Sequence, residues 1–133
     1  MRKAKGTPPA TINPKRGEIW RANLEPTVGA EIQKDNRPVL VLSRAGVGER
    51  SVRLCAPITD YLPARDSLRF WRIEIGDNLQ SGLRKMSCAD VSQTRALDVS
   101  RFVHKDGKAH PTEVEASAAT LAQIVGGDAV KGE

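Results

Sequence analysis

The chain has 133 residues, the size of one domain with one hydrophobic core. Hydrophobic residues make up 39% of it, which suffices for a β-rich domain and argues against a wholly disordered chain. No apolar run approaches the roughly 20 residues of a membrane-spanning helix, and no apolar segment follows the basic N-terminus. We therefore expect a cytoplasmic protein that makes no contact with membranes.

The net charge of +5 is unevenly distributed along the chain. Four of the 21 lysine and arginine residues lie in residues 1–15, whereas none of the 16 acidic residues does. This composition, with its prolines, predicts a mobile basic extension over 1–15, one domain over 16–126 and a short tail over 127–133. Between Lys34 and Arg95 there are eleven basic residues and seven acidic ones. That bias is compatible with RNA as a partner and, equally, with a mixed solvated surface.

The first predicted elements are a strand over residues 17–23 and a long loop over 24–36. Trp20 in the strand is interpreted as a core or barrel-rim aromatic. A loop of that length in a small domain is more often functional than idle.

A second strand is predicted over residues 37–43, where four consecutive aliphatic residues indicate burial on both faces. Pro38 fixes its own φ and favours an extended conformation at Arg37. The guanidinium of Arg37 is therefore placed at the mouth of a rigid strand. An isolated arginine in this position would more often form a surface salt bridge, so the surrounding pattern has to decide its role.

Three further strands are predicted between residues 51 and 93. Two of them contain Cys55 and Cys88, which are far apart in sequence and are expected to be small buried hydrophobes rather than a disulfide or metal pair. The strands span residues 51–58, 68–75 and 87–93, and the loops after the first and second of them span 61–67 and 76–86.

A short capped turn is predicted over residues 98–101, and a helix follows it. The helix begins with a capping-box pattern over residues 112–115 and ends at Gly126-Gly127. Five or more mainly antiparallel strands and one terminal helix predict a mostly β fold, a small sheet or barrel with the helix laid against it. The apolar face of the helix comprises Val114, Ala118, Leu121, Ala122 and Val125.

The sequence contains few of the usual catalytic patterns. It has no phosphate-binding glycine loop, no Cys-x-x-Cys and no nucleophile elbow, and His104 and His110 with two distant cysteines make a poor zinc set. We therefore expect no cofactor and no metal. What remains is a set of polar residues at strand ends, namely Glu31, Arg37, Thr59 and, less securely, Ser92 and Gln93.

Such a set can support RNA cleavage without a metal. The 2′-hydroxyl of the RNA is then the nucleophile, and the protein moves protons and neutralises the charge that develops on phosphorus. Arginine can hold two phosphate oxygens at once, and a threonine hydroxyl can bind the same group.

Several blocks of sequence also resemble the MazF/PemK toxin family in their order and spacing. They are residues 16–20, 25–31, 37–43 and 56–59, and a later block over 93–98 is similar to the family's Gln-x-Arg-[Thr/Ala]-[Ile/Leu]-Asp motif. The resemblance implies an SH3-like barrel of the MazF/PemK/CcdB type with a C-terminal helix. It also implies a homodimer that cleaves single-stranded RNA or mRNA sequence-selectively, is controlled by a cognate antitoxin and reaches DNA only through the antitoxin complex.

The resemblance assigns roles to particular residues. It implies that Arg37 and Thr59 are catalytic and that Glu31 is a base or a supporting residue. Ser92 stands where many members have an acid, so proton transfer is left to Arg37, Glu31, Thr59 or a water. Phe70 is a candidate for RNA contact, with the core as the alternative and Trp71 as a competitor. The other candidate RNA-binding residues are Lys34, Arg65, Arg69, Arg84, Lys85 and Gln93.

Two alternative functions stay open. The first is a catalytically silent module that binds RNA or an antitoxin, which the missing acid at Ser92 supports. The second is a gyrase-poisoning toxin of the same fold. Its action depends on a Trp-Gly-Ile C-terminus, whereas this chain ends Val130-Lys131-Gly132-Glu133.

Overall fold

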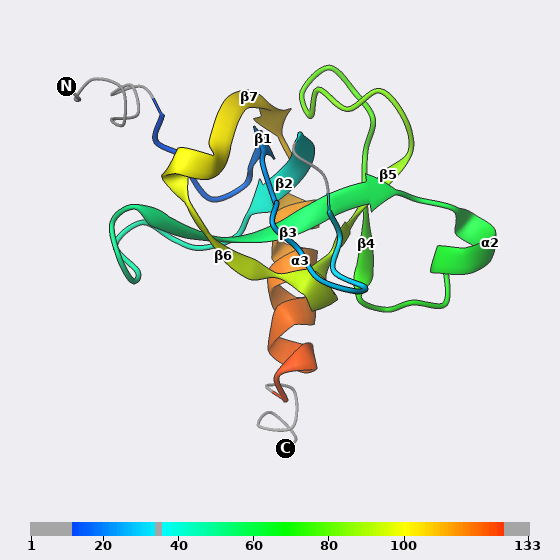
Figure 1. The fold of residues 1–133 in the computed structure, drawn as a ribbon. Helices are drawn as coiled ribbons and strands as arrows, with labels where there is room; N and C mark the ends of the chain where they lie inside the picture. Colours follow the sequence, from blue (N-terminus) through cyan, green and yellow to red (C-terminus); the bar gives the residue numbers. More distant parts are fainter. Residues whose placement is uncertain (1–11, 34–35, 127–133) are drawn as a thin grey trace.

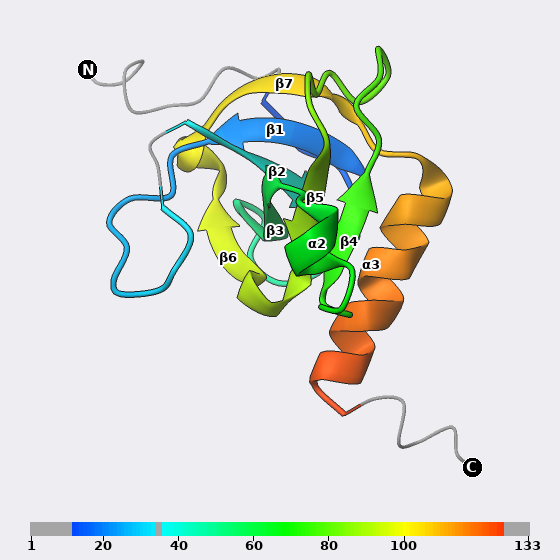
Figure 2. The ribbon, with the colours of Figure 1, turned by 90° about the vertical axis from the view of Figure 1, so that its right-hand side faces the viewer.

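One antiparallel sheet of seven strands, curled into a small barrel, makes up most of the molecule (Figures 1 and 2). The computed structural model describes residues 12–33 and 36–126. The sheet order is β4-β5-β3-β2-β1-β7, and β6 pairs with β3. The long strand β3 thus pairs with three strands, β2, β5 and β6. The strands are β1 (Glu18–Ala22), β2 (Arg37–Val41), β3 (Val52–Asp60), β4 (Arg72–Ile75), β5 (Ser87–Asp90), β6 (Arg95–Asp98) and β7 (Phe102–Lys108).

Helical segments are few, and one of them is long. α3 (Pro111–Ile124) packs beside β4, and its C-terminal end projects past the sheet (Figure 2). The short segments are α2 (Pro63–Asp66), η1 (Val91–Gln93) and η2 (Val99–Arg101). A mostly β fold with a C-terminal helix is therefore confirmed. Within the described part of the chain, no helix combines the length and apolar character needed to cross a membrane.

The aliphatic run of β2 is buried on both faces, as expected. Leu40 belongs to the cluster on the face covered by α3, and Val39 and Val41 belong to the cluster on the other face. Successive strand residues point to opposite faces, so a strand between two clusters needs apolar residues at every position. Trp20 packs edge-on against Phe102 in the second cluster, with ring centroids 5.8 Å apart, which confirms its core position.

Both cysteines are buried and free, as predicted. Cys55 lies in β3 and Cys88 in β5. Burial raises the pKa of the Cys55 thiol to about 12, so this side chain stays a neutral thiol at physiological pH.

Two predicted strands are shorter than the sequence suggested, because local hydrogen bonds take up backbone N–H groups in each. The strand predicted over 68–75 begins only at Arg72, since the Arg69 N–H donates to the Asp66 carbonyl and the Arg72 N–H to the Arg69 carbonyl, both at 2.9 Å. The strand predicted over 87–93 ends at Asp90, whose side chain accepts from the Ser92 N–H and caps η1. Side-chain oxygens of this kind compete with strand ladders for backbone N–H groups.

The C-terminal third also differs from the prediction. The strands β6 and β7 were not predicted, whereas the capped turn over 98–101 is confirmed as η2, with Asp98 as its cap. The helix begins at Pro111 with a capping box between His110 and Glu113. Its N-cap, His110, lies two residues before Thr112, the first residue of the predicted capping box. Its buried residues are Val114, Ser117 and Thr120, whereas Ala122 and Val125, predicted on the apolar face, are exposed.

Candidate functional site

Arg37 is the first residue of β2, and its side chain is half-buried beside two backbone carbonyls. Its Nε and Nη2 atoms donate to the Gln33 carbonyl oxygen, and Nη1 donates to the Ile58 carbonyl oxygen, all at 3.3 Å. Carbonyl oxygens orient a guanidinium without cancelling its charge. Arg37 is therefore held in place and still carries charge available to an anion.

Thr59 lies on β3, the strand next to that of Arg37. Val39 pairs with Pro57 in the β2–β3 ladder, and the same register carried two residues further places Arg37 opposite Thr59. Both line a pocket of about 300 Å³, called here the Arg37 pocket. Its other lining residues are Arg21, Asn36, Pro38, Ile58, Asp60, Leu83, Arg84, Lys85 and Ser87.

The Arg37 pocket carries an excess of positive charge. Lys85 Nζ lies 3.0 Å from Asp60 Oδ1, and Arg84 is exposed and forms no ion pair within the described ranges. Burial is the main reason that the pKa of Arg37 lies below its usual value; Asp60 opposes this shift and Arg21 adds to it. An anion entering the pocket would relieve the cost of placing Arg37 and Arg21 together.

Glu31 and Gln93 line a second pocket, of about 490 Å³, called here the Gln93 pocket. The Gln93 amide accepts from the Ile32 N–H at 2.6 Å and donates to the Ala30 carbonyl at 3.1 Å. Glu31 Oε1 accepts from the Val28 N–H at 2.8 Å. Gln93 thus holds the β1–β2 loop, and Glu31 closes a turn within it. The structure brings Arg37 and Thr59 together and places Glu31 in the pocket next to theirs.

Arg65 and Arg69 contribute to a different group of charges, called here the Asp66 cluster and completed by Arg72. Arg65 binds both Asp66 oxygens at 2.8 Å, and Arg69 and Arg72 approach the same carboxylate at 3.6 Å. The hydrogen bonds from Arg65 hold the pKa of the fully buried Asp66 carboxyl well below its usual range. The charge of these arginines is therefore shared with an internal carboxylate.

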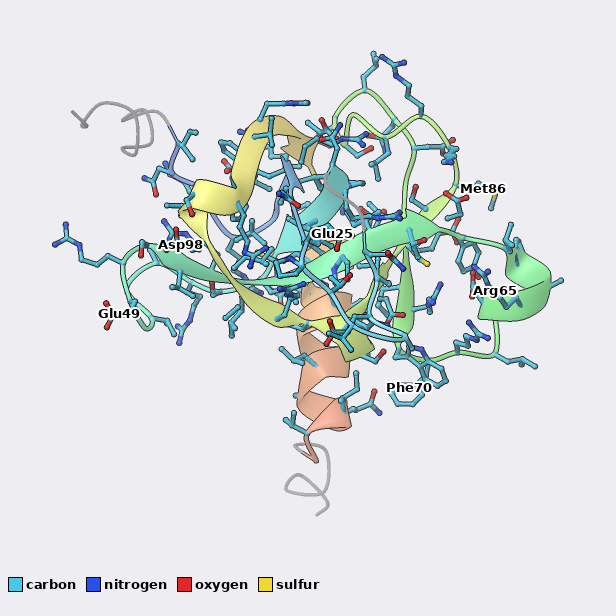
Figure 3. All side chains as sticks on the ribbon, viewed as in Figure 1. Glu25, Glu49, Arg65, Phe70, Met86 and Asp98 are labelled. Carbon is cyan, nitrogen blue, oxygen red and sulfur yellow. The ribbon has the colours of Figure 1, made fainter. Side chains whose placement is uncertain are left out.

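The remaining candidate residues are scattered. Phe70 is 57% exposed and lies edge-on to Trp71 with centroids 5.4 Å apart, so it is outside the core. Figure 3 shows Phe70 and Arg65 on the side of the molecule that carries α2 and β4, away from Glu49 and Asp98. Lys34 lies outside the described residues.

Three charged residues near the site were missed by the sequence reasoning. Asp60 follows Thr59 directly, a signal that could have been used. Arg21 lines the Arg37 pocket, and it pairs with Asp106, which is 85 residues away in sequence, so no local pattern could reveal the pair. Within residues 12–33 and 36–126, no group of three or more His, Cys, Asp or Glu side chains is placed to hold a metal ion.

Known structures share this fold. MazF from Deinococcus radiodurans is 21% identical, with a TM-score of 0.69 over 85% of this chain and 96% of that one. The Mycobacterium tuberculosis toxin MazF-mt6 is 22% identical, with a TM-score of 0.62 over 81% and 95%. A mycobacterial endoribonuclease in complex with its cognate antitoxin is 15% identical, with a TM-score of 0.65 over 85% and 95%.

Sequence comparison gives the family directly. No curated protein matches the chain. A family model, described as the PemK-like, MazF-like toxin of type II toxin-antitoxin systems, matches residues 15–125, which include all seven strands and α3. The chain therefore belongs to the PemK-like, MazF-like toxin family of type II toxin-antitoxin systems.

Proposed function

We propose that this toxin is an endoribonuclease that cleaves single-stranded RNA in the cytoplasm without a metal ion. The observation that carries the proposal is the pairing of Arg37 with Thr59 in one pocket bordered by Arg21, Arg84 and Lys85. A guanidinium that bonds to carbonyl oxygens and lies beside a hydroxyl suits a phosphodiester, because both groups can bind non-bridging oxygens. One of the similar structures is described as an endoribonuclease, which supports RNA as the substrate.

In the proposed reaction the RNA supplies its own nucleophile. The 2′-oxygen loses its proton and attacks the adjacent phosphorus, so the O2′–P bond forms while the P–O5′ bond breaks. A second proton goes to the leaving 5′-oxygen, which leaves a 2′,3′-cyclic phosphate and a 5′-hydroxyl. Arg37 stabilises the charge of the phosphorane, and the Thr59 hydroxyl donates to the same oxygens.

Cleavage in excess EDTA tests the proposal. We expect purified protein to cut a long RNA at discrete sites and to leave 2′,3′-cyclic phosphate and 5′-hydroxyl ends. A strict magnesium requirement, or 5′-phosphate ends, would contradict it. Retention of uncut RNA would indicate the silent binding module, and DNA breaks that need gyrase would indicate the gyrase-poisoning alternative.

Two carboxylates compete for the role of proton acceptor. Asp60 lines the Arg37 pocket, whereas Glu31 lies in the Gln93 pocket and bonds to the Val28 N–H. We expect Asp60→Asn to slow cleavage by about 100-fold, since general-base catalysis contributes on this order. Glu31→Gln should slow cleavage much less. The reverse pattern would move the role to Glu31.

The partners follow from the same pocket. We propose a homodimer whose positive surface around Arg37 takes either RNA or an acidic segment of a cognate antitoxin, with DNA reached only through that antitoxin. The similar structures include MazE–MazF complexes from Deinococcus radiodurans, which support an antitoxin as partner. If the surface is shared, the antitoxin should displace bound RNA competitively. Formation of a ternary complex would contradict this model.

A further inference from the structure

We propose that Arg21 is a second phosphate-binding residue of the Arg37 pocket and that Asp106 orients it for this role. The inference rests on the proposed function and adds to it a substrate contact on β1. It is drawn from the arrangement of β1, β2 and β7 at the end of the sheet.

The two arginines approach the pocket from different faces of the sheet. Arg21 pairs with Pro38 and Ala22 with Arg37 in the β1–β2 ladder, so the side chains of Arg21 and Arg37 leave the strands on opposite faces. Both nevertheless line the same pocket, at the end of β2. Burial is the main cause of the lowered pKa of Arg37, and the positive charge of Arg21 adds to it. A phosphate lying between the two arginines would be bound from two sides.

Asp106 holds Arg21 at the pocket without enclosing its whole guanidinium. Arg21 Nε donates to Asp106 Oδ2 at 2.8 Å, and Nη1 donates to the Asn36 carbonyl at 3.3 Å. Nη2 has no hydrogen-bond partner within the described ranges. The Asp106 side chain is only 9% exposed and is also 3.0 Å from His104 Nε2. Arg21 thus has an anchored edge and donors left for a ligand.

The backbone at Asp106 holds the loop that carries Arg84 and Lys85. Gly82 lies so close to the Asp106 carbonyl that a Cβ at this position would clash with it, and its φ of +75° also favours glycine. The Lys108 N–H donates to the Gln80 carbonyl at 2.9 Å. The loop that carries Arg84 and Lys85 is therefore fixed to β7 beside Arg21. This segment of β7 thus contacts both Arg21 and the loop that carries Arg84 and Lys85, and Asp60 is the only acid among the described residues that line the pocket.

An ordinary structural ion pair is the competing explanation, and the chain offers a matched control for it. Arg16 pairs with Glu115 at 3.1 Å and donates to the Leu42 carbonyl, and its side chain is 29% exposed, against 31% for Arg21. Arg16 lines a different pocket, between β1 and α3. If both pairs only stabilise the fold, loss of either arginine should affect RNA equally.

Binding of a single-stranded 2′-O-methyl RNA, which lacks the nucleophilic hydroxyl, tests the inference by fluorescence anisotropy across a salt series. We expect Arg21→Gln to weaken binding by about tenfold and to reduce the slope of log K against log salt by about 0.7, the value for one lost phosphate contact. Its kcat/KM for RNA cleavage should fall at least as much. Arg16→Gln should change neither quantity. Equal behaviour of the two variants would overturn the inference.

A second measurement uses the unaltered chain, in case Arg21→Gln does not fold. Phenylglyoxal modifies accessible guanidinium groups, and the 2′-O-methyl RNA should protect Arg21 and Arg37 but not Arg16. Equal modification of Arg21 with and without RNA would overturn the inference. Failure of the proposed function has a different signature, because the unaltered protein would then leave RNA uncut in EDTA whatever Arg21 binds.

Discussion

The Arg37 pocket and the Asp66 cluster are both rich in arginine, but their charges are compensated differently. In the Asp66 cluster three arginines surround the buried Asp66 carboxylate, and Arg72 also lies 2.9 Å from the buried Asp90 carboxylate. Among the described residues of the Arg37 pocket, the guanidinium of Arg37 bonds only to carbonyl oxygens, and Arg84 forms no ion pair. The role of an arginine thus depends on which acceptors its N–H groups already bond to. Compensated charge stabilises the loop, and uncompensated charge is available to an external anion.

The largest effect is expected from Arg37 itself. Arg37→Ala should leave a folded dimer and lower cleavage by at least ~100-fold, because a charge-stabilising donor in the transition state is worth about that much. Arg37→Lys should also fail, since a point charge cannot hold two oxygens at once. Single-turnover cleavage of a long RNA measures this, with Arg16→Ala as the control. Near-native cleavage by Arg37→Ala would remove this residue from the catalytic set.

Asp66 should matter for stability rather than for cleavage. Asp66→Asn should lower the free energy of unfolding at pH 7 by about 2 kcal/mol, because the buried side chain at position 66 loses its charge-assisted hydrogen bonds with Arg65. The folded-state pKa of Asp66 is depressed, so its contribution is complete above its ordinary pKa of 3.8 and is lost as the pH falls further. Urea denaturation between pH 7 and pH 3 measures this.

The control for that experiment is Asp77→Asn, a change at an exposed carboxylate outside any ion pair of the described residues. The difference in the free energy of unfolding between the Asp66→Asn variant and the unaltered protein should become smaller toward pH 3. The Asp77→Asn variant should show no such difference from the unaltered protein. A difference that is constant with pH would show that the Asp66 cluster stabilises the fold by packing and not by charge.

The smallest effect is expected from replacing a single exposed cation in each of the two regions. Arg84→Gln should weaken binding of 2′-O-methyl RNA by about threefold and make it less salt-dependent, as expected for loss of one phosphate contact. Arg65→Gln should weaken it less, because Arg65 already binds Asp66 through two hydrogen bonds. Anisotropy titrations at two salt concentrations compare them. A larger loss at Arg65 would place the RNA over α2.

Local sequence pattern predicted the part of the fold that depends on neighbours along the chain. The Arg-Pro junction and the aliphatic run of β2 were sufficient to place Arg37 at the end of a buried strand, and the Pro-x-Thr block placed Thr59 near it. The β6 and β7 strands were missed because their ladders are long-range and their faces are partly polar. The helix start was misplaced because a histidine, an unusual cap, occupies the position before Pro111.

The candidate site was harder to predict because its partners are distant in sequence. The role of Gln93 in RNA binding stays a prediction, and the bonds of its amide to the β1–β2 loop, 61 and 63 residues away, could not be read from a local pattern. The charge of Arg65 and Arg69 could be counted from sequence, but their convergence on Asp66 depends on the α2 turn. Positive residues can be listed from a sequence, whereas their availability requires the fold.

A structure of the protein with bound 2′-O-methyl RNA tests the central claim most directly, namely that the Arg37 pocket holds the scissile phosphate. We predict a phosphate with its non-bridging oxygens within hydrogen-bond distance of the Arg37 guanidinium and the Thr59 hydroxyl. RNA that runs over the Asp66 cluster or through the Gln93 pocket, with the Arg37 pocket empty of phosphate, would contradict the account.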